Sequence, residues 1–272
     1  RAGWGGSGAE MRDAGGGGNG FTMAEVMVAA GAREIADGQV VVVGIGIPLV
    51  SAVLAKRTHA PNMTLLLELG VVDSDPRQLG VGNADARIWE RATAFTSTLD
   101  VMGTVLHRGL VDIGFLGALE VDPYGNMNST EVPLGGGRIR RFGGSGGGND
   151  MASLARRTII IARHEPRKIC ATLYHNTSPG HLEGGDARRR AGLPGGGPWR
   201  VITDKGVFGF HPETRRMVPL SLHPGITAEA FREATGFPLE VPPDLPVTPA
   251  PTTAQLKLIR EEIDPGRAFT GA

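Results

Sequence analysis

The stretch Gln39-Val40-Val41-Val42-Val43-Gly44-Ile45-Gly46-Ile47-Pro48-Leu49 decides the fold, because it joins a strand signal directly to a helix signal. Four consecutive valines do not alternate with polar residues, which predicts a strand buried on both faces. The glycines allow a tight turn, and Pro48 suits the first turn of a helix expected over Leu49–Arg57. A buried strand that leads at once into a helix is the unit from which parallel sheets are built.

The same pattern continues on both sides of this stretch. Upstream, Thr22 and Glu25 have capping-box spacing, which predicts a helix over Met23–Ala36. Downstream lie further apolar runs: buried strands at Thr64–Leu67 and Arg157–Arg163, a candidate neighbouring strand at Lys168–Leu173, a short run at Val201–Thr203, and a C-terminal helix at Ala254–Ile263. This alternation predicts an α/β fold with an open, largely parallel sheet flanked by helices.

Composition excludes several classes of protein. The chain has 272 residues with 28 basic and 28 acidic side chains, so it lacks the positive charge typical of nucleic-acid binding. No apolar run approaches the roughly 20 residues that a bilayer span needs. The single cysteine, Cys170, cannot form a disulfide within the chain, which fits a reducing compartment. We therefore expect a soluble, cytoplasmic protein that binds neither nucleic acid nor membrane.

Glycine is unusually frequent, with 42 residues, and it dominates the first 20 positions. Such a segment has almost nothing to bury, so residues 1–20 are expected to form a disordered tail whose role the sequence does not indicate. Residues 21–270 are expected to form a single domain.

Glu68 is the first residue that could carry chemistry. It follows the apolar run Leu65-Leu66-Leu67 and precedes Leu69-Gly70, so a carboxylate stands at the carboxyl end of a buried strand. Ligands of open α/β sheets collect at this edge, and partial desolvation would make a carboxylate more reactive. On this local pattern alone, a structural glutamate that caps a helix or pairs with an arginine is the favoured interpretation.

A glycine-rich segment, Gly143-Gly144-Ser145-Gly146-Gly147-Gly148-Asn149-Asp150, precedes a helical stretch at Met151–Arg156. Successive backbone N–H groups at a helix start can bind an anion, and glycines let a thioester approach the main chain. Arg138, Arg140 and Arg141 lie just upstream and could meet phosphates. A flexible surface loop explains the same composition equally well.

Two further segments are open to both structural and functional interpretations. Gly44-Ile45-Gly46 lacks the third glycine of a dinucleotide-binding fingerprint, so it serves either packing or a cofactor contact. The loop Asp122–Thr130 is polar and rich in turn signals. Its Asn and Ser side chains could bind a substrate carboxylate, although a structural loop is favoured.

The histidines and the cysteine give no sign of a metal site. None of the seven histidines has His-x-x-x-His spacing, and a lone cysteine cannot form a metal-binding pair. His107, His164 and His175 are interpreted as surface or hydrogen-bonded core residues. Cys170 is interpreted as a buried strand residue rather than a nucleophile, since no activating partner is near it in sequence.

Taken together, these segments resemble family I coenzyme A transferases, and in particular β subunits of the glutaconate type. The resemblance covers essentially residues 21–270 and depends on the order of many short matches: Asp37–Val41, Gly44–Leu49, Leu54–Arg57, Ala60-Pro61, Leu67–Gly70, Val121–Asn126, Asn128–Thr130, Gly144–Gly147, Thr177–Gly180, Gly192–Gly195, Val201–Gly206 and Lys257–Gly266.

The resemblance implies that Glu68 is the catalytic carboxylate, acylated in a ping-pong reaction through a glutamyl-CoA thioester. It implies oxyanion and CoA-binding positions at five glycines, namely Gly146, Gly147, Gly70, Gly44 and Gly46. Asn126 and Asn128 become candidate substrate-binding residues. Leu69 departs from the serine or asparagine usual in the family, which leaves the environment of the carboxylate open.

Partners and alternatives follow from the same resemblance. The chain is expected to work with an α subunit in a hetero-oligomer, to use acyl-CoA and a carboxylic acid (a dicarboxylate by family likeness) as substrates, and to hold no metal and no permanently bound cofactor. The alternatives are a CoA-ester hydrolase or C–C bond-cleaving relative on the same scaffold, or a non-catalytic CoA-binding subunit. Retention of Glu68 favours the transferase.

Overall fold

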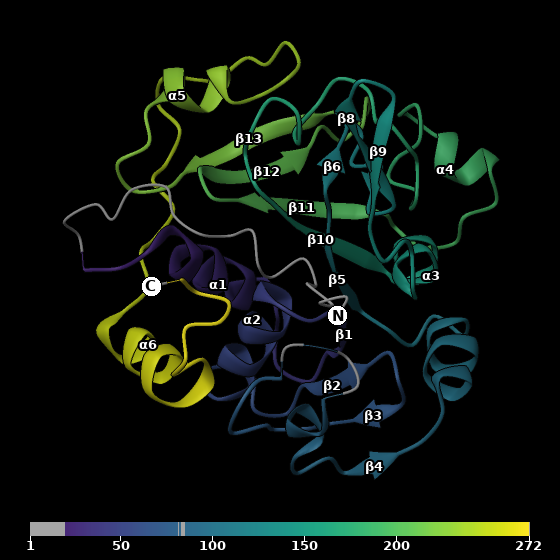
Figure 1. Cartoon of the computed structure of the whole chain (residues 1–272), viewed down its shortest axis with the longest axis vertical. Helices are drawn as coiled ribbons and strands as arrows, with labels where there is room; N and C mark the ends of the chain where they lie inside the picture. The colour runs from purple at the N-terminus through teal and green to yellow at the C-terminus, as the bar shows by residue number, and fades with distance from the viewer. Residues whose placement is uncertain (1–19, 81, 83–84, 272) are drawn as a thin grey trace.

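A nine-stranded sheet forms the centre of the protein in the computed structural model, which describes residues 20–80, 82 and 85–271 (Figure 1). The strand order is β13-β12-β11-β10-β5-β1-β2-β3-β4. The expected tail lies, except for Gly20, outside the described residues. No helix in the described part of the chain has the length and apolarity that a membrane span requires.

Five parallel strands make up the middle of the sheet, which confirms the predicted fold class. They are β11 (Pro198–Thr203), β10 (Arg157–Ala162), β5 (Ile113–Gly117), β1 (Val40–Val43) and β2 (Thr64–Leu67). Val43 pairs with Leu67 and with Phe115, so β1, β2 and β5 end at the same edge. This is the edge at which open α/β sheets bind ligands.

Antiparallel strands extend the sheet on both sides: β12 (Gly206–Phe210) and β13 (Met217–Leu222) on one side, β3 (Val71–Val72) and β4 (Ala94–Phe95) on the other. Two small separate sheets complete the strands. One pairs β6 (Glu120–Val121) with β7 (Met127–Asn128), and the other pairs β8 (Glu131–Gly135) with β9 (Arg138–Arg141).

Burial on both faces explains the unbroken apolar runs of the central strands. Alternate residues enter two cores: Val41, Val43 and Phe115 pack into one, whereas Val42 and Leu116 pack into the other. The first core lies against α1 (Met23–Arg33), α2 (Ile47–Lys56) and the C-terminal helix η4 (Leu258–Ile263), which α6 (Thr253–Lys257) precedes. The second lies against α3 (Gly148–Leu154) and the π-helix η3 (Leu99–Leu106).

Shorter helices occupy the periphery: η2 (Ala86–Trp89), α4 (Ala187–Arg190) and α5 (Ala228–Glu233). The capping box that begins α1 is confirmed, because Glu25 N–H donates to the Thr22 hydroxyl and Thr22 N–H donates to the Glu25 carboxylate. The helix ends at Arg33, three residues earlier than expected, because residues 34–38 turn into β1.

The expected strand at Lys168–Leu173 is wrong. The neighbour of β10 is β11, and residues 168–173 contribute only isolated bridges, from Ile169 to Val121 and from Cys170 to Gly236. Ile169 is fully buried in the second core although it belongs to no strand. Its apolar character therefore reflects packing under the sheet rather than a place within it.

Candidate active site

Glu68 stands directly after β2, at the carboxyl edge of the sheet. A turn over Leu67–Gly70 carries it, closed by a hydrogen bond of 3.0 Å from Gly70 N–H to the Leu67 carbonyl. Gly70 has φ of 96°, and a Cβ at this position would collide with the Thr96 carbonyl oxygen. Only glycine satisfies both conditions, so the sequence Glu68-Leu69-Gly70 encodes the turn that presents the carboxylate.

The glycine-rich segment folds over this carboxylate. Gly147 N–H donates a hydrogen bond of 3.0 Å to Glu68 Oε1, although 79 residues separate the two in sequence. Gly146 has φ of 50°, and a Cβ there would lie 3.4 Å from Oε1 and 3.5 Å from Oε2. A Cβ on Gly147 would lie 3.1 Å from Glu68 Cδ and 2.6 Å from Met102 Cε. Glycine thus lets the main chain lie directly against the carboxylate.

Hydrogen bonds within the chain hold this glycine loop, residues 143–148, in place. Gly144 N–H donates to the Ser129 carbonyl at 3.2 Å, and the Ser129 hydroxyl donates back to the Gly144 carbonyl at 3.0 Å. Ser145 accepts from Gly148 N–H and, through its hydroxyl, from Asn149 N–H. These bonds fix the position of the Gly147 N–H that meets Glu68, and a fixed donor beside a charged group is the arrangement that electrostatic stabilisation requires.

Gly44 and Gly46 lie at the same edge of the sheet, after β1. Val43 pairs with Leu67, so Gly44 and Glu68 are the next residues on two adjacent strands. Gly44 N–H donates to the Phe115 carbonyl at 3.3 Å, which ties the end of β1 to β5. Gly46 has φ of 104° and caps α2 without a side chain. All five glycines singled out in the sequence are thus placed around the ends of β1 and β2 or against the Glu68 side chain.

Asn126 and Asn128 are buried, and their amides are engaged within the chain. Asn126 Nδ2 donates to Asp122 at 2.7 Å and its Oδ1 accepts from Gly180 N–H at 2.7 Å. Asn128 Nδ2 donates to Glu120 Oε2 at 2.7 Å. Substrate contact by these amides stays a prediction; the observed bonds brace the segment that holds the glycine loop through Ser129.

The local electrostatics agree with a structural role for the Asp122 turn. Burial raises the pKa of Asp122, although hydrogen bonds from Asn126 and Tyr124 act in the opposite direction. Asp122 accepts from the Tyr124 and Asn126 N–H groups at 2.9 Å each. This turn, a candidate substrate loop on its sequence, is therefore closed on its own carboxylate.

Three histidines are buried and neutral. Burial lowers the pKa of His164 to about 3 and the pKa values of His181 and His223 to about 4. His164 bonds the hydroxyls of Thr203 and Thr235, as expected for a core histidine. Burial also raises the pKa of the Cys170 thiol to about 11, which disfavours a thiolate nucleophile. No cluster of three or more potential metal ligands occurs among the described residues.

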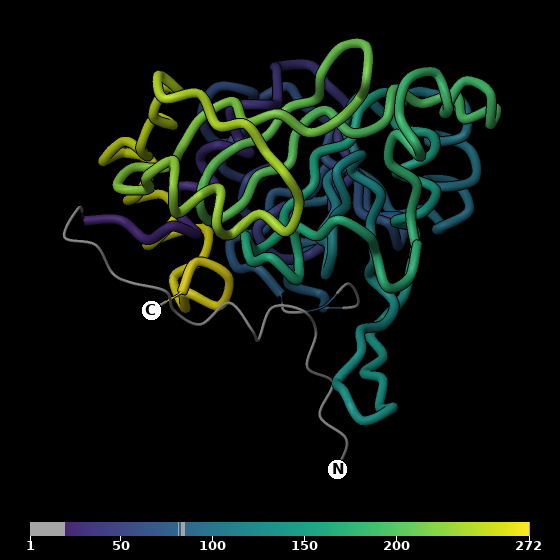
Figure 2. Tube along the Cα trace, turned by 90° about the horizontal axis from the view of Figure 1, so that it is seen from above, coloured from purple at the N-terminus to yellow at the C-terminus, as the bar shows by residue number. Residues whose placement is uncertain are grey.

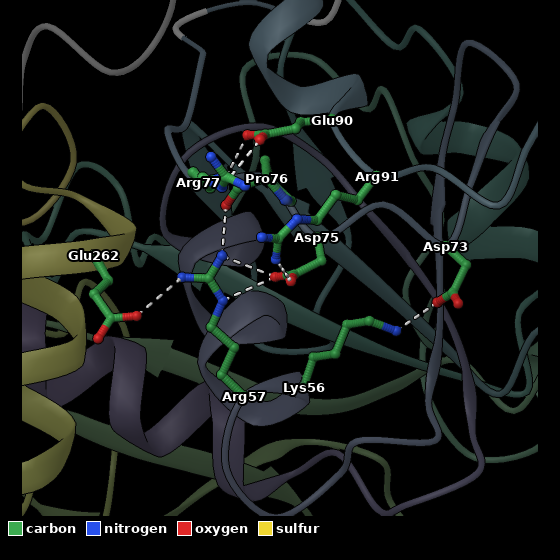
Figure 3. Close-up of polar contacts among 9 residues, drawn as sticks. All are labelled: Lys56, Arg57, Asp73, Asp75, Pro76, Arg77, Glu90, Arg91 and Glu262. Carbon is green, nitrogen blue, oxygen red and sulfur yellow. Dashed lines mark hydrogen bonds and ion pairs between the residues drawn. The ribbon is translucent and has the colours of Figure 1, made fainter.

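A pocket of about 630 Å³ lies elsewhere, lined by the end of α2, by the segment between β3 and β4, and by η4, and no sequence motif marks it. Figure 3 shows the polar contacts of several residues in and around this lining. Arg57 donates to Asp75 at 2.8 Å and to the Pro76 carbonyl at 2.8 Å, and Arg91 donates to Asp75 at 2.9 Å. Burial raises the pKa of Asp75, but the bonds and charges of Arg57 and Arg91 outweigh it and leave that pKa below its usual range. Because its arginines are neutralised by carboxylates, the pocket is a structural junction rather than an anion site.

Sequence reasoning missed Met102, which lies against the glycine loop, and it marked Ser129 only as a possible substrate contact and not as a residue that holds this loop. Met102 comes from η3, a π-helix between β4 and β5 that packs against α3. No local motif predicts these two contacts, because each joins segments that are separated in sequence.

The model of the coenzyme A transferase family matches residues 24–234. The β subunit of glutaconate CoA-transferase from Acidaminococcus fermentans is 39% identical over 254 residues, which cover 92% of this chain and 95% of that one. The β subunit of 3-oxoadipate CoA-transferase from Pseudomonas knackmussii is 35% identical and covers 88% of this chain and 92% of that one.

Solved structures agree with these matches. A chain of the A. fermentans glutaconate CoA-transferase superposes with a TM-score of 0.86 at 37% identity, covering 93% of this chain and 98% of that one. A chain of the decarboxylase AibA/AibB superposes with a TM-score of 0.77 at 28% identity, covering 93% and 100%. The resemblance seen in the sequence is confirmed: the chain belongs to the coenzyme A transferase family, as a glutaconate-like β subunit that works with an α subunit.

Proposed function

We propose that Glu68 is the residue of this CoA-transferase that becomes acylated and then carries CoA. The observation that supports this proposal is the hydrogen bond of 3.0 Å from Gly147 N–H to Glu68 Oε1 at the carboxyl edge of the sheet. Glu68 is half-buried, so it is partly screened from water but remains accessible to a ligand. A carboxylate so placed is a covalent nucleophile of the kind that divides one difficult exchange into easier steps.

In the first half of the reaction, a Glu68 oxygen attacks the thioester carbonyl of the donor acyl-CoA. The tetrahedral oxyanion collapses, the C–S bond breaks, and a mixed anhydride and CoA thiolate form. The thiolate then attacks the Glu68 carbonyl carbon, which releases the donor as its carboxylate and leaves a glutamyl-CoA thioester. In the second half, the acceptor carboxylate repeats these steps in reverse and leaves as its CoA ester.

Gly147 is placed to assist the steps in which the Glu68 carbon is attacked. Its N–H already meets Oε1, so negative charge that develops on this oxygen would meet a fixed donor. One such donor is typically worth about 3–4 kcal/mol of transition-state stabilisation. Gly146 has no side chain and so leaves space beside both carboxylate oxygens, which a Cβ would crowd.

The substrates we propose are a CoA thioester and a dicarboxylic acid. The glutaconate and 3-oxoadipate enzymes are named after dicarboxylates, and this chain matches the β subunits of both over nearly its whole length. We place the α subunit opposite Glu68, where it completes the site and contributes to substrate selection. No permanently bound cofactor is needed for this chemistry, and a cytoplasmic location suits a chain with one unpaired thiol.

Trapping the intermediate tests this proposal. The chain is coexpressed with its α subunit, incubated with glutaryl-CoA, and treated with hydroxylamine or borohydride before peptide mass spectrometry. We expect a hydroxamate or a reduced side chain at Glu68, absent from Glu68→Ala and from enzyme treated without acyl-CoA. Glu68→Gln serves as the matched variant, because it keeps the shape and the Gly147 hydrogen bond but lacks the nucleophile.

A hydrolase or a C–C bond-cleaving activity is the second candidate, favoured by the similarity to AibA/AibB, which is described as a decarboxylase, and by Leu69 beside Glu68. Turnover of acyl-CoA without any acceptor, with no trapped glutamyl thioester, would establish this second candidate and refute the transferase mechanism.

A further inference from the structure

The β8–β9 hairpin stands out from the body of the protein. Figure 2 shows this arm, residues 131–141, projecting away from the rest of the chain. Its two strands form a separate sheet, with Glu131 paired to Arg141 and Pro133 to Ile139. At roughly 3.4 Å per residue, its five-residue strand reaches on the order of 16 Å beyond its base.

The arm exposes apolar side chains that nothing in the described chain covers. Leu134 is 52% exposed and Ile139 is 45% exposed, one on each strand. An isolated two-stranded ribbon is marginally stable in water, and its unpaired edges invite pairing with another chain. A projecting hairpin with a leucine and an isoleucine on its surface therefore has the character of an element that is stabilised by a partner.

The base of the arm is joined directly to the loop that contacts Glu68. Phe142 N–H donates to the Thr130 carbonyl at 2.8 Å, and the Ser129–Gly144 hydrogen bonds follow immediately. Three residues after Gly144 the chain donates Gly147 N–H to Glu68. Whatever binds the arm is thus connected, through a short braced segment, to the backbone donor of the active site.

The charge of the arm indicates what kind of surface it fits. Residues 131–141 include three arginines, Arg138, Arg140 and Arg141, and one glutamate, Glu131, so the formal net charge of this segment is +2 (three positive, one negative). Glu131 pairs with Arg141 at 3.2 Å, and Arg140 lies over the Phe142 ring at 4.9 Å. The complementary surface has acidic side chains around an apolar seat for Leu134 and Ile139.

We propose that the β8–β9 arm inserts into the α subunit and thereby fixes the glycine loop of the assembled active site. The α subunit is the occupant because the chain is a β subunit of a two-subunit family and the arm begins at the Glu68 loop. The proposal rests on the function proposed above, since it assigns the arm to the partner with which Glu68 works.

The test measures assembly with the cognate α subunit by native mass spectrometry and by titration of purified subunits. The variant Leu134→Asp with Ile139→Asp places two charges on the arm. The matched control is Leu110→Asp, because Leu110 is 50% exposed but precedes β5 at the opposite edge of the sheet. Thermal unfolding of the isolated chains checks that each variant folds like the wild type.

We expect the arm variant to raise the Kd for the α subunit by about 30-fold or more, whereas Leu110→Asp leaves it within about threefold. A second variant, Arg138→Glu, should weaken assembly and make it less sensitive to salt. If the arm variants assemble like the wild type, or if the wild-type chain does not bind the α subunit, the proposal is overturned.

Two other results would also overturn it. The first is an arginine variant that raises KM for acyl-CoA without weakening assembly, which would assign the arm to CoA phosphates. The second is an arm variant that no longer self-associates but still binds the α subunit, which would assign the arm to a second copy of this chain. Assembly is measured without turnover, so failure to trap acylated Glu68 would refute the proposed function and leave the arm proposal standing.

Discussion

At the scale of single residues, Gly147 is the position where sequence, packing and chemistry meet most closely. Its φ of −77° at the N-cap of α3 suits any residue, so alanine would cause no backbone strain there. A Cβ would nevertheless lie 2.6 Å from Met102 Cε and 3.1 Å from Glu68 Cδ. The glycine is required by contact with the carboxylate rather than by backbone conformation.

We therefore predict that Gly147→Ala displaces Glu68 or the loop and slows formation of the glutamyl thioester about 100-fold, because loss of one aligned donor costs that much or more. The measurement is single-turnover trapping at Glu68. Gly148→Ala is the control, since a Cβ there would lie 3.5 Å from Leu116 Cδ2, an ordinary contact. Equal trapping rates in both variants would contradict the assigned role of Gly147.

The buried histidines make a second prediction at this scale. His164 has a folded pKa of about 3, whereas an unfolded histidine titrates near 6.5, so the unfolded chain binds the proton more readily below pH 6.5. The stability that comes from keeping His164 neutral is present at pH 7 and is lost as the pH falls from about 6.5 towards 3. Each such histidine removes up to about 1.4 kcal/mol of unfolding free energy per pH unit.

Urea unfolding at pH 7, 6 and 5 measures this slope. His164→Gln, which keeps polar atoms near Thr203 and Thr235, should flatten the slope by up to about 1.4 kcal/mol per pH unit. His175→Gln removes an exposed histidine and serves as the matched control for the loss of an imidazole. A wild-type slope in His164→Gln would show that His164 is not kept neutral by burial.

At the scale of elements, the central strands were predictable and the connections were not. The strands β2 and β10 were predicted from their apolar runs. A strand that is buried on both faces shows no alternation of apolar and polar residues, so its sequence is recognisable. The same reasoning misled at Lys168–Leu173, where Ile169 is buried outside any strand. An apolar run records burial, and burial alone does not distinguish a strand from a loop packed beneath it.

The candidate site was likewise predictable only in part from the sequence. Glu68 and the glycine loop could be named because each has a local signature and because the family resemblance joined them. The contact between Gly147 and Glu68, the support from Met102, and the projecting hairpin arise from pairs of segments distant in sequence. A single sequence read alone carries no signal for such pairs, so the geometry had to come from the folded chain.

The segment between β3 and β4 gives an element-scale prediction. Arg57, at the end of α2, joins this segment through Asp75 and the Pro76 carbonyl, and it also lies 3.9 Å from Glu262 on η4 (Figure 3). The side chain of Arg57 is only 15% exposed. Its removal would leave the Asp75 carboxylate and a carbonyl partly unsatisfied.

We predict that Arg57→Ala lowers the free energy of unfolding by about 1–3 kcal/mol, whereas Arg77→Ala changes it by less than about 0.5 kcal/mol. Arg77 is the matched control because it belongs to the same cluster but is 68% exposed. Urea unfolding of the isolated chain gives both values. If the two variants were equally stable, the cluster would not be what holds the β3–β4 segment.

At the scale of the whole molecule, the two ends of the described chain close on each other. Arg260, on η4, donates to both oxygens of Glu25 on α1, at 2.6 and 2.8 Å, and the Thr22 hydroxyl donates to the Thr270 carbonyl at 2.9 Å. Glu25 is 1% exposed. The C-terminal helices therefore complete the first core, where Ile259, Ile263 and Phe269 pack beside the α1 and α2 residues.

This closure depends on keeping a buried carboxylate ionised. Burial raises the pKa of Glu25, but the hydrogen bond and charge of Arg260, with the Thr22 N–H, outweigh burial and leave that pKa below its usual value. The stabilisation is therefore present at neutral pH and is lost as the pH falls below about 4.5. Without Arg260 the dominant remaining influence is burial, and the sign of the shift reverses.

Arg260→Ala should thus lower the free energy of unfolding by about 2–3 kcal/mol at pH 7, less than for a fully buried pair because the Arg260 side chain is 30% exposed. In this variant Glu25 would have a raised pKa. The loss of unfolding free energy relative to the wild type should therefore become smaller as the pH falls towards 4.5, where the carboxyl becomes neutral. Lys257→Ala removes an exposed partner of Glu261 from the preceding helix and should cost less than about 0.5 kcal/mol at either pH. Urea unfolding at pH 7 and pH 5 separates the outcomes: a deficit for Arg260→Ala that stays constant or grows with acidity would mean that Glu25 does not depend on Arg260 for its charge.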